Sequence, residues 1–301
     1  MIQIAFSALY HHPLPEGHRF PMAKYSLIPE QLLYEGTFEQ KHFFAPRPFE
    51  NGAIEAVHHK DYVAKLKEGT LSHKEARRIG FPYSATLVER EEHICAGTTQ
   101  GAEKALDNGI AFNVAGGTHH AYADHGEGFC MYNDIAVAAQ YLLKKGRIKQ
   151  ALVVDLDVHQ GNGTASIFAD EPRVFTFSMH CQKNYPLRKE ASDLDIPLDW
   201  YTDDATYLQT LAKYLPPLIE QVKPDIIFYQ SGVDILSNDK LGKLSVSVAG
   251  AKERDYQVLS LARKHEIPLM ASMGGGYSER MRDIVEAHCN TFRVAAQLYY
   301  V

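Results

Sequence analysis

From residue 91 to the end of the chain, short runs of β-branched and aromatic residues alternate with longer segments of helical pattern. The expected strands cover residues 110–114, 151–158, 174–179, 225–232 and 267–273. The expected helices cover residues 91–109, 133–146, about 203–222, 251–265 and 278–300, with Thr202 as candidate N-cap of the third. Because the strands are continuous apolar runs, both faces of the sheet should be covered by helices. The pattern predicts an α/β fold with a parallel sheet.

The first 90 residues lack this alternation. Residues 11–31 and 77–91 are rich in proline, glycine and aromatic residues, which predicts long ordered loops. Ligands of open α/β sheets bind beyond the carboxyl ends of the strands, so these loops should wall the site. No repeat, low-complexity tract or linker divides the chain, and residues 1–301 are therefore predicted to form one domain.

Composition disfavours several classes of protein. The net charge is -6 and no basic block is present, which argues against a nucleic-acid partner. No stretch approaches the roughly 20 apolar residues of a membrane span, and no signal-peptide pattern is expected at the start. The scattered cysteines form no C-x-x-C pair and predict free thiols in a reducing, cytoplasmic compartment. They are Cys95, Cys130, Cys181 and Cys289.

Polar residues gather where two expected strands end. Asp155, Asp157 and His159 are spaced two apart, so in a strand they would share a face. Buried carboxylates are costly unless they are paired or bind a metal, and the strand at 225–232 delivers Asp234 into a following loop. Two carboxylates and one imidazole are a sufficient ligand set for catalytic zinc, so Asp157, His159 and Asp234 are the expected ligands. Asp155, deeper on the strand, could orient another group or face a monovalent cation. The alternative is a set of polar loop-capping residues.

A histidine pair follows the strand at 110–114. After two glycines the chain presents His119 and His120, which fit metal ligands, acid/base catalysts or exposed loop residues. A zinc site favours the second of these, because a zinc-bound water needs a base to take its proton and histidine is the usual choice. Asp155 and Asn162 are available to orient such a base.

A glycine-rich loop follows the strand at 267–273 and ends in Tyr277. The phenol could donate a hydrogen bond to a developing oxyanion, or it could simply pack on a glycine-rich turn. Neither a P-loop nor a dinucleotide-binding spacing is present, so nucleotide binding is not expected.

Taken in order, the segments GGTHHA, GFCMYND, DLDVHQGNG, SGVDILSNDKLGKLSVS and GGGY resemble the zinc-dependent histone deacetylases and their bacterial relatives. The resemblance runs from about residue 55 to the final helix. HQGNG and DILSNDKLGKLSVS are most similar to the class IV, histone deacetylase 11-like branch. The resemblance implies the single-domain arginase/deacetylase fold, a parallel eight-stranded sheet with helices on both faces.

The resemblance also implies roles for individual residues. The implied zinc ligands are Asp157, His159 and Asp234. The implied catalytic residues are His119, His120 as general base, Tyr277, and the supporting Asp155 and Asn162. A structural potassium ion would be contacted by Asp155, Asp157, His159, Ser178 and Met179. The implied substrate-binding residues are Gly128 and Phe129, which wall an acyl-lysine tunnel, and Gly275.

Two departures from the family pattern are visible. Asn162 supports His120 where some branches carry aspartate, so the ring is held without a charge and should be less basic. The acidic rim residue that many members use to grip a substrate backbone has no counterpart in residues 80–91.

The predicted function is zinc-dependent removal of an acetyl or longer acyl group from N-acyl-lysine, as a peptide or protein, or from a similar N-acyl amine. One alternative is hydrolysis of acetylpolyamines or other small amides at the same site, and another is a non-catalytic acyl-lysine binding protein. A two-manganese ureohydrolase of the arginase type would need additional aspartates where Gly161 and Gly232 stand. No pattern predicts an oligomeric state.

Overall fold

A single parallel sheet organises the molecule. The computed structural model describes residues 1–49 and 52–300. Its eight strands lie in the order β2-β1-β3-β8-β7-β4-β5-β6, and neighbouring strands pair in parallel. The strands are Gln3–Ala5 (β1), Phe43–Phe44 (β2), Ile110–Asn113 (β3), Ala151–Asp155 (β4), Val174–Cys181 (β5), Leu194–Leu198 (β6), Ile226–Gln230 (β7) and Leu269–Ser272 (β8). The predicted α/β fold and the implied eight-stranded sheet are confirmed.

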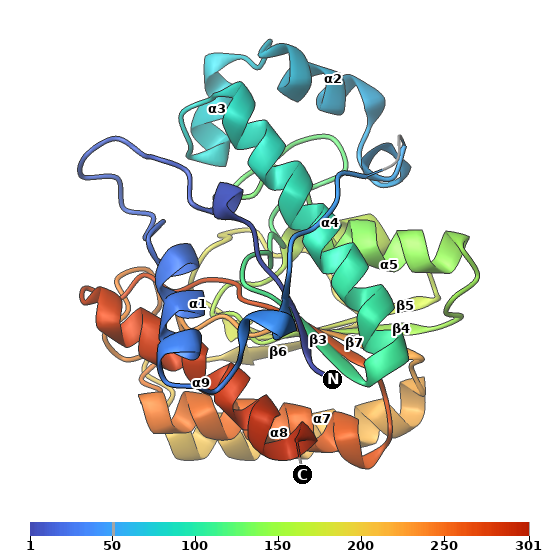
Figure 1. The fold of residues 1–301 in the computed structure, drawn as a ribbon, viewed down its shortest axis with the longest axis vertical. Coiled ribbons are helices and arrows are strands. Elements are labelled where there is room, and N and C mark those ends of the chain that lie inside the picture. The colour runs from blue at the N-terminus through green and yellow to red at the C-terminus, as the bar shows by residue number, and fades with distance from the viewer. Residues whose placement is uncertain (50–51, 301) are drawn as a thin grey trace.

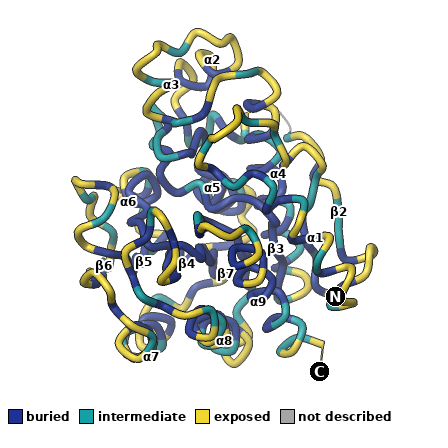
Figure 2. The backbone as a smooth tube through the Cα atoms, turned by 90° about the vertical axis from the view of Figure 1, so that its left-hand side faces the viewer, coloured by how far each residue is buried: buried dark blue, intermediate teal, exposed yellow. Residues whose placement is uncertain are grey.

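Helices form a layer on each side of the sheet. The α-helices of the described residues are Lys24–Tyr34 (α1), Lys60–Glu68 (α2), His73–Ile79 (α3), Ala85–Asn108 (α4), Asp134–Lys144 (α5), Asn162–Phe168 (α6), Asp204–Val222 (α7), Val248–Lys264 (α8) and Met281–Tyr299 (α9). In Figure 1, α4 and α5 cover one face of the sheet, and α7, α8 and α9 cover the other. Figure 2 shows the central strands, among them β3, β4 and β7, buried between these layers, as their continuous apolar sequences require.

The predicted helices and strands after residue 91 are all present, with shifted ends. The strand predicted over residues 151–158 ends at Asp155, so the residues that follow it belong to a loop. The helix α7 is capped by Asp203, whose side chain accepts a hydrogen bond from the Thr206 N–H, and not by Thr202. The Thr202 hydroxyl instead donates to the Asp199 carbonyl, at 2.8 Å.

The first 90 residues contain more regular structure than predicted. Within residues 11–31 the helix α1 begins at Lys24 and continues through Pro29, although proline has no N–H to donate. Within residues 77–91 the long helix α4 begins at Ala85, and the Ser84 side chain caps it. Strands β1 and β2 have three and two residues, too few to show a periodic pattern. Strand β6 reads LDIPL, and its proline is tolerated because this strand lies at the sheet edge.

The sheet order decides where the functional groups meet. Strands β3, β8, β7 and β4 are neighbours at the centre of the sheet, and their carboxyl ends lie at the same edge. The loops after these four strands therefore converge there. Within residues 1–49 and 52–300, no helix is long and apolar enough to cross a membrane.

Candidate active site

Asp157, His159 and Asp234 form a compact buried cluster beyond the ends of β4 and β7. Each offers one ligand atom, and these atoms all lie within 4.8 Å of one another. His159 Nδ1 is 3.1 Å from Asp157 Oδ1 and 3.1 Å from Asp234 Oδ2. The structure thus brings together the three residues expected to bind metal. Asp157 and His159, which were expected on a strand face, lie instead in the loop that follows β4.

Backbone hydrogen bonds hold this loop against its own carboxylates. The Asp157 N–H donates to Asp155 Oδ1 at 3.1 Å, and the His159 N–H donates to Asp157 Oδ1 at 3.0 Å. The Val158 N–H of the same loop donates to Asp234 Oδ1 at 2.9 Å, and from the loop after β8 the Gly275 N–H donates to Asp157 Oδ2 at 2.8 Å. The carboxylates are fixed by fully buried donors, as a preorganised ligand set requires.

Three glycines leave no room for side chains around these carboxylates. A Cβ at Gly275 would collide with the Asp234 carboxylate, and a Cβ at Gly232 would collide with Asp157. A Cβ at Gly161 would collide with the Asp155 carboxylate. The two-metal ureohydrolase alternative needs aspartates at positions 161 and 232, and this packing disfavours it.

The charges of the cluster favour a cation at its centre. Burial and the Asp157 charge raise the pKa of Asp234 to about 7. Burial by itself lowers the pKa of His159, but hydrogen bonds to Asp157 and Asp234 outweigh it and raise that pKa to about 10. A positive charge between the two carboxylates therefore stabilises the cluster, whether it is a proton on His159 or a metal ion. With two oxygen donors and one nitrogen donor, the residues fit a zinc ion with an open position.

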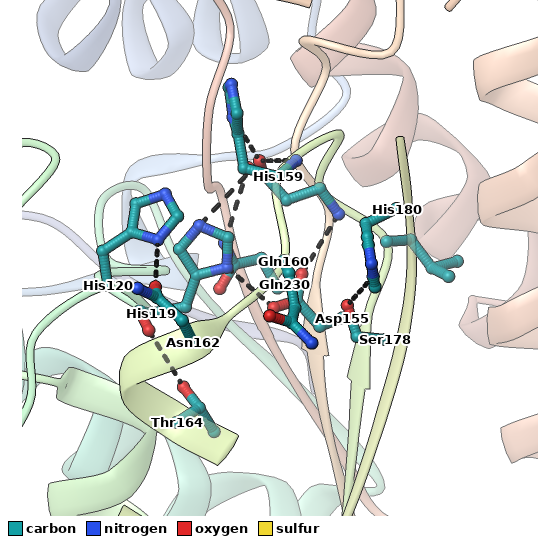
Figure 3. Close-up of polar contacts among 12 residues, drawn as sticks. His119, His120, Asp155, His159, Gln160, Asn162, Thr164, Ser178, His180 and Gln230 are labelled. Carbon is teal, nitrogen blue, oxygen red and sulfur yellow. Dashed lines mark hydrogen bonds and ion pairs between the residues drawn. The ribbon is translucent and has the colours of Figure 1, made fainter. Parts of the chain in front are cut away.

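His119 and His120 lie side by side next to this cluster (Figure 3), with ring centroids 4.0 Å apart. His119 Nδ1 is 2.7 Å from Asp155 Oδ2, and its Nε2 is 3.9 Å from Asp157 Oδ1. His120 Nδ1 is 2.7 Å from Asn162 Oδ1. The two orienting residues expected from the sequence therefore hold one histidine each.

The different partners give the two rings different basicities. Burial lowers the pKa of His119, but the Asp155 and Asp157 charges outweigh it and raise that pKa above its usual value. Burial and the neighbouring His119 and His159 hold the pKa of His120 well below its usual value. His120 is therefore the neutral ring of the pair, as the uncharged Asn162 partner predicts.

Glu127 fixes the orientation of Asn162, and the sequence offered no signal for it. The Asn162 Nδ2 donates to Glu127 Oε1 at 2.7 Å and to the Tyr122 hydroxyl at 3.0 Å. With both amide protons used, Asn162 Oδ1 faces His120 and must accept from it. His120 Nδ1 therefore carries the ring proton, and its Nε2 is left as an acceptor.

Tyr277 lies at the active site beside Gly128 and Phe129, the two residues expected to wall the substrate tunnel. Its N–H donates to Asp239 Oδ2 at 2.5 Å, and its ring lies 6.0 Å from that of Phe129. Gly128 lies so close to the His120 ring that a Cβ would approach a ring carbon to 2.7 Å. Burial and the Asp234 and Asp157 charges raise the pKa of Tyr277 well above its usual value, so the phenol stays a donor at neutral pH.

Two connected cavities meet at His120, His159 and Tyr277. The inner one has a volume of about 30 Å³ and extends towards Tyr25 and Arg90. The outer one, the mouth, has a volume of about 230 Å³ and includes Tyr185, whose ring centroid is 4.9 Å from that of His120. Gly128 and Phe129 line both cavities, whereas Gly275 lines the inner one.

The family resemblance implies that two further residues, Ser178 and Met179, contact a potassium ion. Ser178 on β5 is paired with Asp155 on β4, and Met179 is the next residue along the strand. The Ser178 Oγ lies 2.9 Å from His180 Nδ1 (Figure 3). The serine is thus adjacent to the carboxylate that supports His119, and the potassium assignment stays a prediction.

Comparison with known proteins identifies related sequences and a related fold. A model of the histone deacetylase domain matches residues 18–292. An uncharacterized protein of Picosynechococcus sp. is 44% identical over 98% of this chain and 100% of its own length. Histone deacetylase 2 of Arabidopsis thaliana is 29% identical over 89% of this chain and 72% of its own. The crystal structure of a histone deacetylase homologue complexed with SAHA superposes with a TM-score of 0.84 at 25% identity, covering 98% of this chain and 84% of that one.

Proposed function

The chain belongs to the histone deacetylase family, and from that premise we propose that it is a zinc-dependent amidohydrolase acting on N-acyl-lysine or a similar N-acyl amine. One observation carries the proposal. A buried ligand triad, two differently supported histidines and a protonated phenol converge on the same pair of cavities. A deacetylase requires these groups, whereas a protein that only binds acyl-lysine has no need of a general base.

Asp157, His159 and Asp234 would hold the zinc ion. When bound there, zinc would polarise an amide carbonyl and make water easier to deprotonate near neutral pH. Asp155, Asp157, His159, Ser178 and Met179 would hold a structural potassium ion, a proposal supported by the pairing of Asp155 with Ser178 across β4 and β5.

His120, Tyr277 and His119 have different roles in the proposed reaction. His120 Nε2 accepts a proton from the attacking water, because its Nδ1–H is held by Asn162. The Tyr277 phenol donates a hydrogen bond to the amide oxygen as negative charge develops there. His119 lies beside the reacting group with its positive charge stabilised by the Asp155 carboxylate, and a protonated histidine supplies a proton to the leaving amine.

The acyl group that the site accepts is proposed to be short. We infer that the inner cavity is the space beyond the reacting carbonyl, and its volume of about 30 Å³ leaves room for only a small acyl group. An acetyl group fits this space without rearrangement, whereas a myristoyl chain needs several side chains to move. Asn162 and the HQGNG segment support assignment to the class IV branch. Four free, buried cysteines support a cytoplasmic location.

Turnover measured by mass spectrometry on zinc-loaded protein tests the proposal. Acetyl-lysine peptide, myristoyl-lysine peptide and an acetylated polyamine are compared side by side, with Asp157→Ala as control. We expect hydrolysis of the acetyl-lysine peptide, at least about tenfold slower hydrolysis of the myristoyl peptide, and loss of both in the control. Zinc binding with no turnover of any substrate would contradict the hydrolase and favour the acyl-lysine binding protein.

A further inference from the structure

We propose that Arg19 and Arg78 form an anion-binding subsite at the mouth of the active-site cavity, and that the preferred substrate carries a carboxylate near the acylated amine. This inference rests on the proposed hydrolase and names the class of substrate that the hydrolase takes. Suitable substrates are an acyl-lysine flanked by acidic residues or an N-acyl amine with its own carboxylate.

The charge at the mouth is one-sided. Among the residues that line the outer cavity, Arg19 and Arg78 are charged, and none is an aspartate or glutamate. The same cavity reaches His120, His159 and Tyr277, so a substrate in place must pass between the arginines and the reacting centre. The net charge of the whole chain is -6, which makes this positive mouth a local feature.

Both arginines are free to meet a ligand. Their side chains are exposed, and neither forms an ion pair or a side-chain hydrogen bond with any residue in 1–49 or 52–300. Two unpaired guanidinium groups in one concave site are suited to bidentate binding of a carboxylate.

The backbone under both arginines is held in place. The Arg19 guanidinium lies 5.1 Å from the centre of the Phe129 ring, and the neighbouring His18 Nε2 is 3.0 Å from the Gly80 carbonyl oxygen. The Arg78 carbonyl accepts a hydrogen bond from the Gly128 N–H at 3.2 Å. The loop before α1 and the end of α3 (Figure 1) are thus both tied to the tunnel wall, which fixes the backbone positions of both arginines before a substrate arrives.

Positive charge at the mouth also discriminates against cationic substrates. An acetylated polyamine or a peptide with flanking lysines would bring its own positive charge towards Arg19 and Arg78, and like charges cost affinity. Because both arginines are exposed, the preference should weaken at high salt, where the screening length falls to about 3 Å.

The test uses three capped peptides that differ only beside the acetyl-lysine, with flanking Glu, Gln or Lys on both sides. Free Nε-acetyl-lysine carries its own carboxylate and N-acetylputrescine carries none. Comparing these two compounds with the peptides distinguishes a small carboxylate substrate from an acidic peptide. At low salt we expect kcat/KM to be at least about tenfold higher for the Glu peptide than for the Lys peptide. The Arg19→Gln/Arg78→Gln double variant should reduce this ratio to less than threefold. The matched control is Arg77→Gln, because Arg77 is exposed on the same helix but does not line the cavity.

Two results would overturn the inference. One is equal kcat/KM for the Glu and Lys peptides in the wild-type protein, and the other is a ratio that the double variant leaves unchanged. Fluorescence anisotropy of labelled peptides gives a readout that does not require turnover. Tighter binding of the Glu peptide without hydrolysis of any peptide would reject the hydrolase but support the subsite, and equal binding of all peptides would reject the subsite.

Discussion

The inner site and its mouth are built in opposite ways. The inner site is buried, negatively charged and assembled from loops that follow neighbouring central strands. The mouth carries two exposed arginines from the first 90 residues, Arg19 and Arg78, and takes its other lining residues from later loops. This difference separates two tasks, since a buried preorganised site can perform one chemistry while an exposed rim can select the substrate. Substitutions in the inner site should therefore change kcat, whereas substitutions in the mouth should change the ranking of substrates.

The largest effect is expected from Tyr277→Phe, which removes the phenol and keeps the ring. Loss of one donor to the developing oxyanion should lower kcat by on the order of 10²–10³ while KM changes little. Steady-state kinetics with the acetyl-lysine peptide checks this. Near-full activity would mean that Tyr277 only packs on the glycine-rich turn.

A smaller effect is expected from Glu127→Ala, because Glu127 acts through Asn162. Without this acceptor the Asn162 amide can rotate, so that His120 loses its fixed Oδ1 partner. We expect kcat to fall by about tenfold, within the range for groups that orient catalytic residues. The control is Glu190→Ala, because Glu190 contacts Asn162 only indirectly. It accepts a hydrogen bond from the Tyr122 hydroxyl at 3.1 Å, and that hydroxyl accepts from Asn162. An equal fall of kcat in both variants would contradict the positioning role of Glu127.

Asn162→Asp tests the electrostatic difference between the two histidines. A carboxylate next to His120 should raise the pKa of that ring by about one unit. Because a general base works in its neutral form, the acidic limb of the kcat/KM profile should move to higher pH by the same amount. The control is Asn184→Asp, which places a charge in the mouth and should leave the limb in place. An unshifted limb in Asn162→Asp would argue that His120 is not the base.

The smallest effect is expected at His58 and concerns stability rather than turnover. This residue joins the N-terminal segments to the inner site. Its Nδ1–H donates to the Tyr122 carbonyl and its Nε2 accepts from the Asn133 N–H, both at 2.9 Å. Burial lowers the pKa of His58 to about 4, so the folded protein holds the ring neutral. Below its ordinary pKa of about 6.5 the unfolded chain binds a proton that the folded protein excludes, which costs about 3 kcal/mol of stability by pH 4.

His58→Gln provides the matching measurement, because glutamine can make both hydrogen bonds but does not titrate. Denaturant unfolding at several pH values should show a wild-type loss between pH 6.5 and pH 4 that is larger than the loss in this variant. The exposed neighbour His59 serves as control, since His59→Gln should follow the wild type. Parallel curves for all three proteins would contradict the assignment of His58.

How far the sequence predicts the molecule also differs between the two regions. Asp157, His159 and Asp234 could be placed together because each follows a strong apolar run, and parallel strands end at one edge of the sheet. Asp155 and Asn162 were expected to support histidines, and each contacts one. Glu127 could not be foreseen, because its contact to Asn162 depends on how a loop with two adjacent positive-φ residues, Gly128 and Phe129, is folded. Arg19 and Arg78 could not be placed either, because tertiary contacts bring the loop before α1 and the end of α3 to the same cavity, and the first 90 residues lack the strand–helix alternation.

The most direct test of the central claim is a zinc titration of metal-free protein, in which bound metal and hydrolysis of the acetyl-lysine peptide are measured on the same samples. The account predicts that activity rises with added zinc and saturates near one equivalent per chain. It also predicts that Asp234→Ala neither binds this equivalent tightly nor becomes active, because three buried side chains hold the ion. Full activity in the metal-free protein, or an Asp234→Ala variant that binds zinc and turns over like the wild type, would contradict the claim.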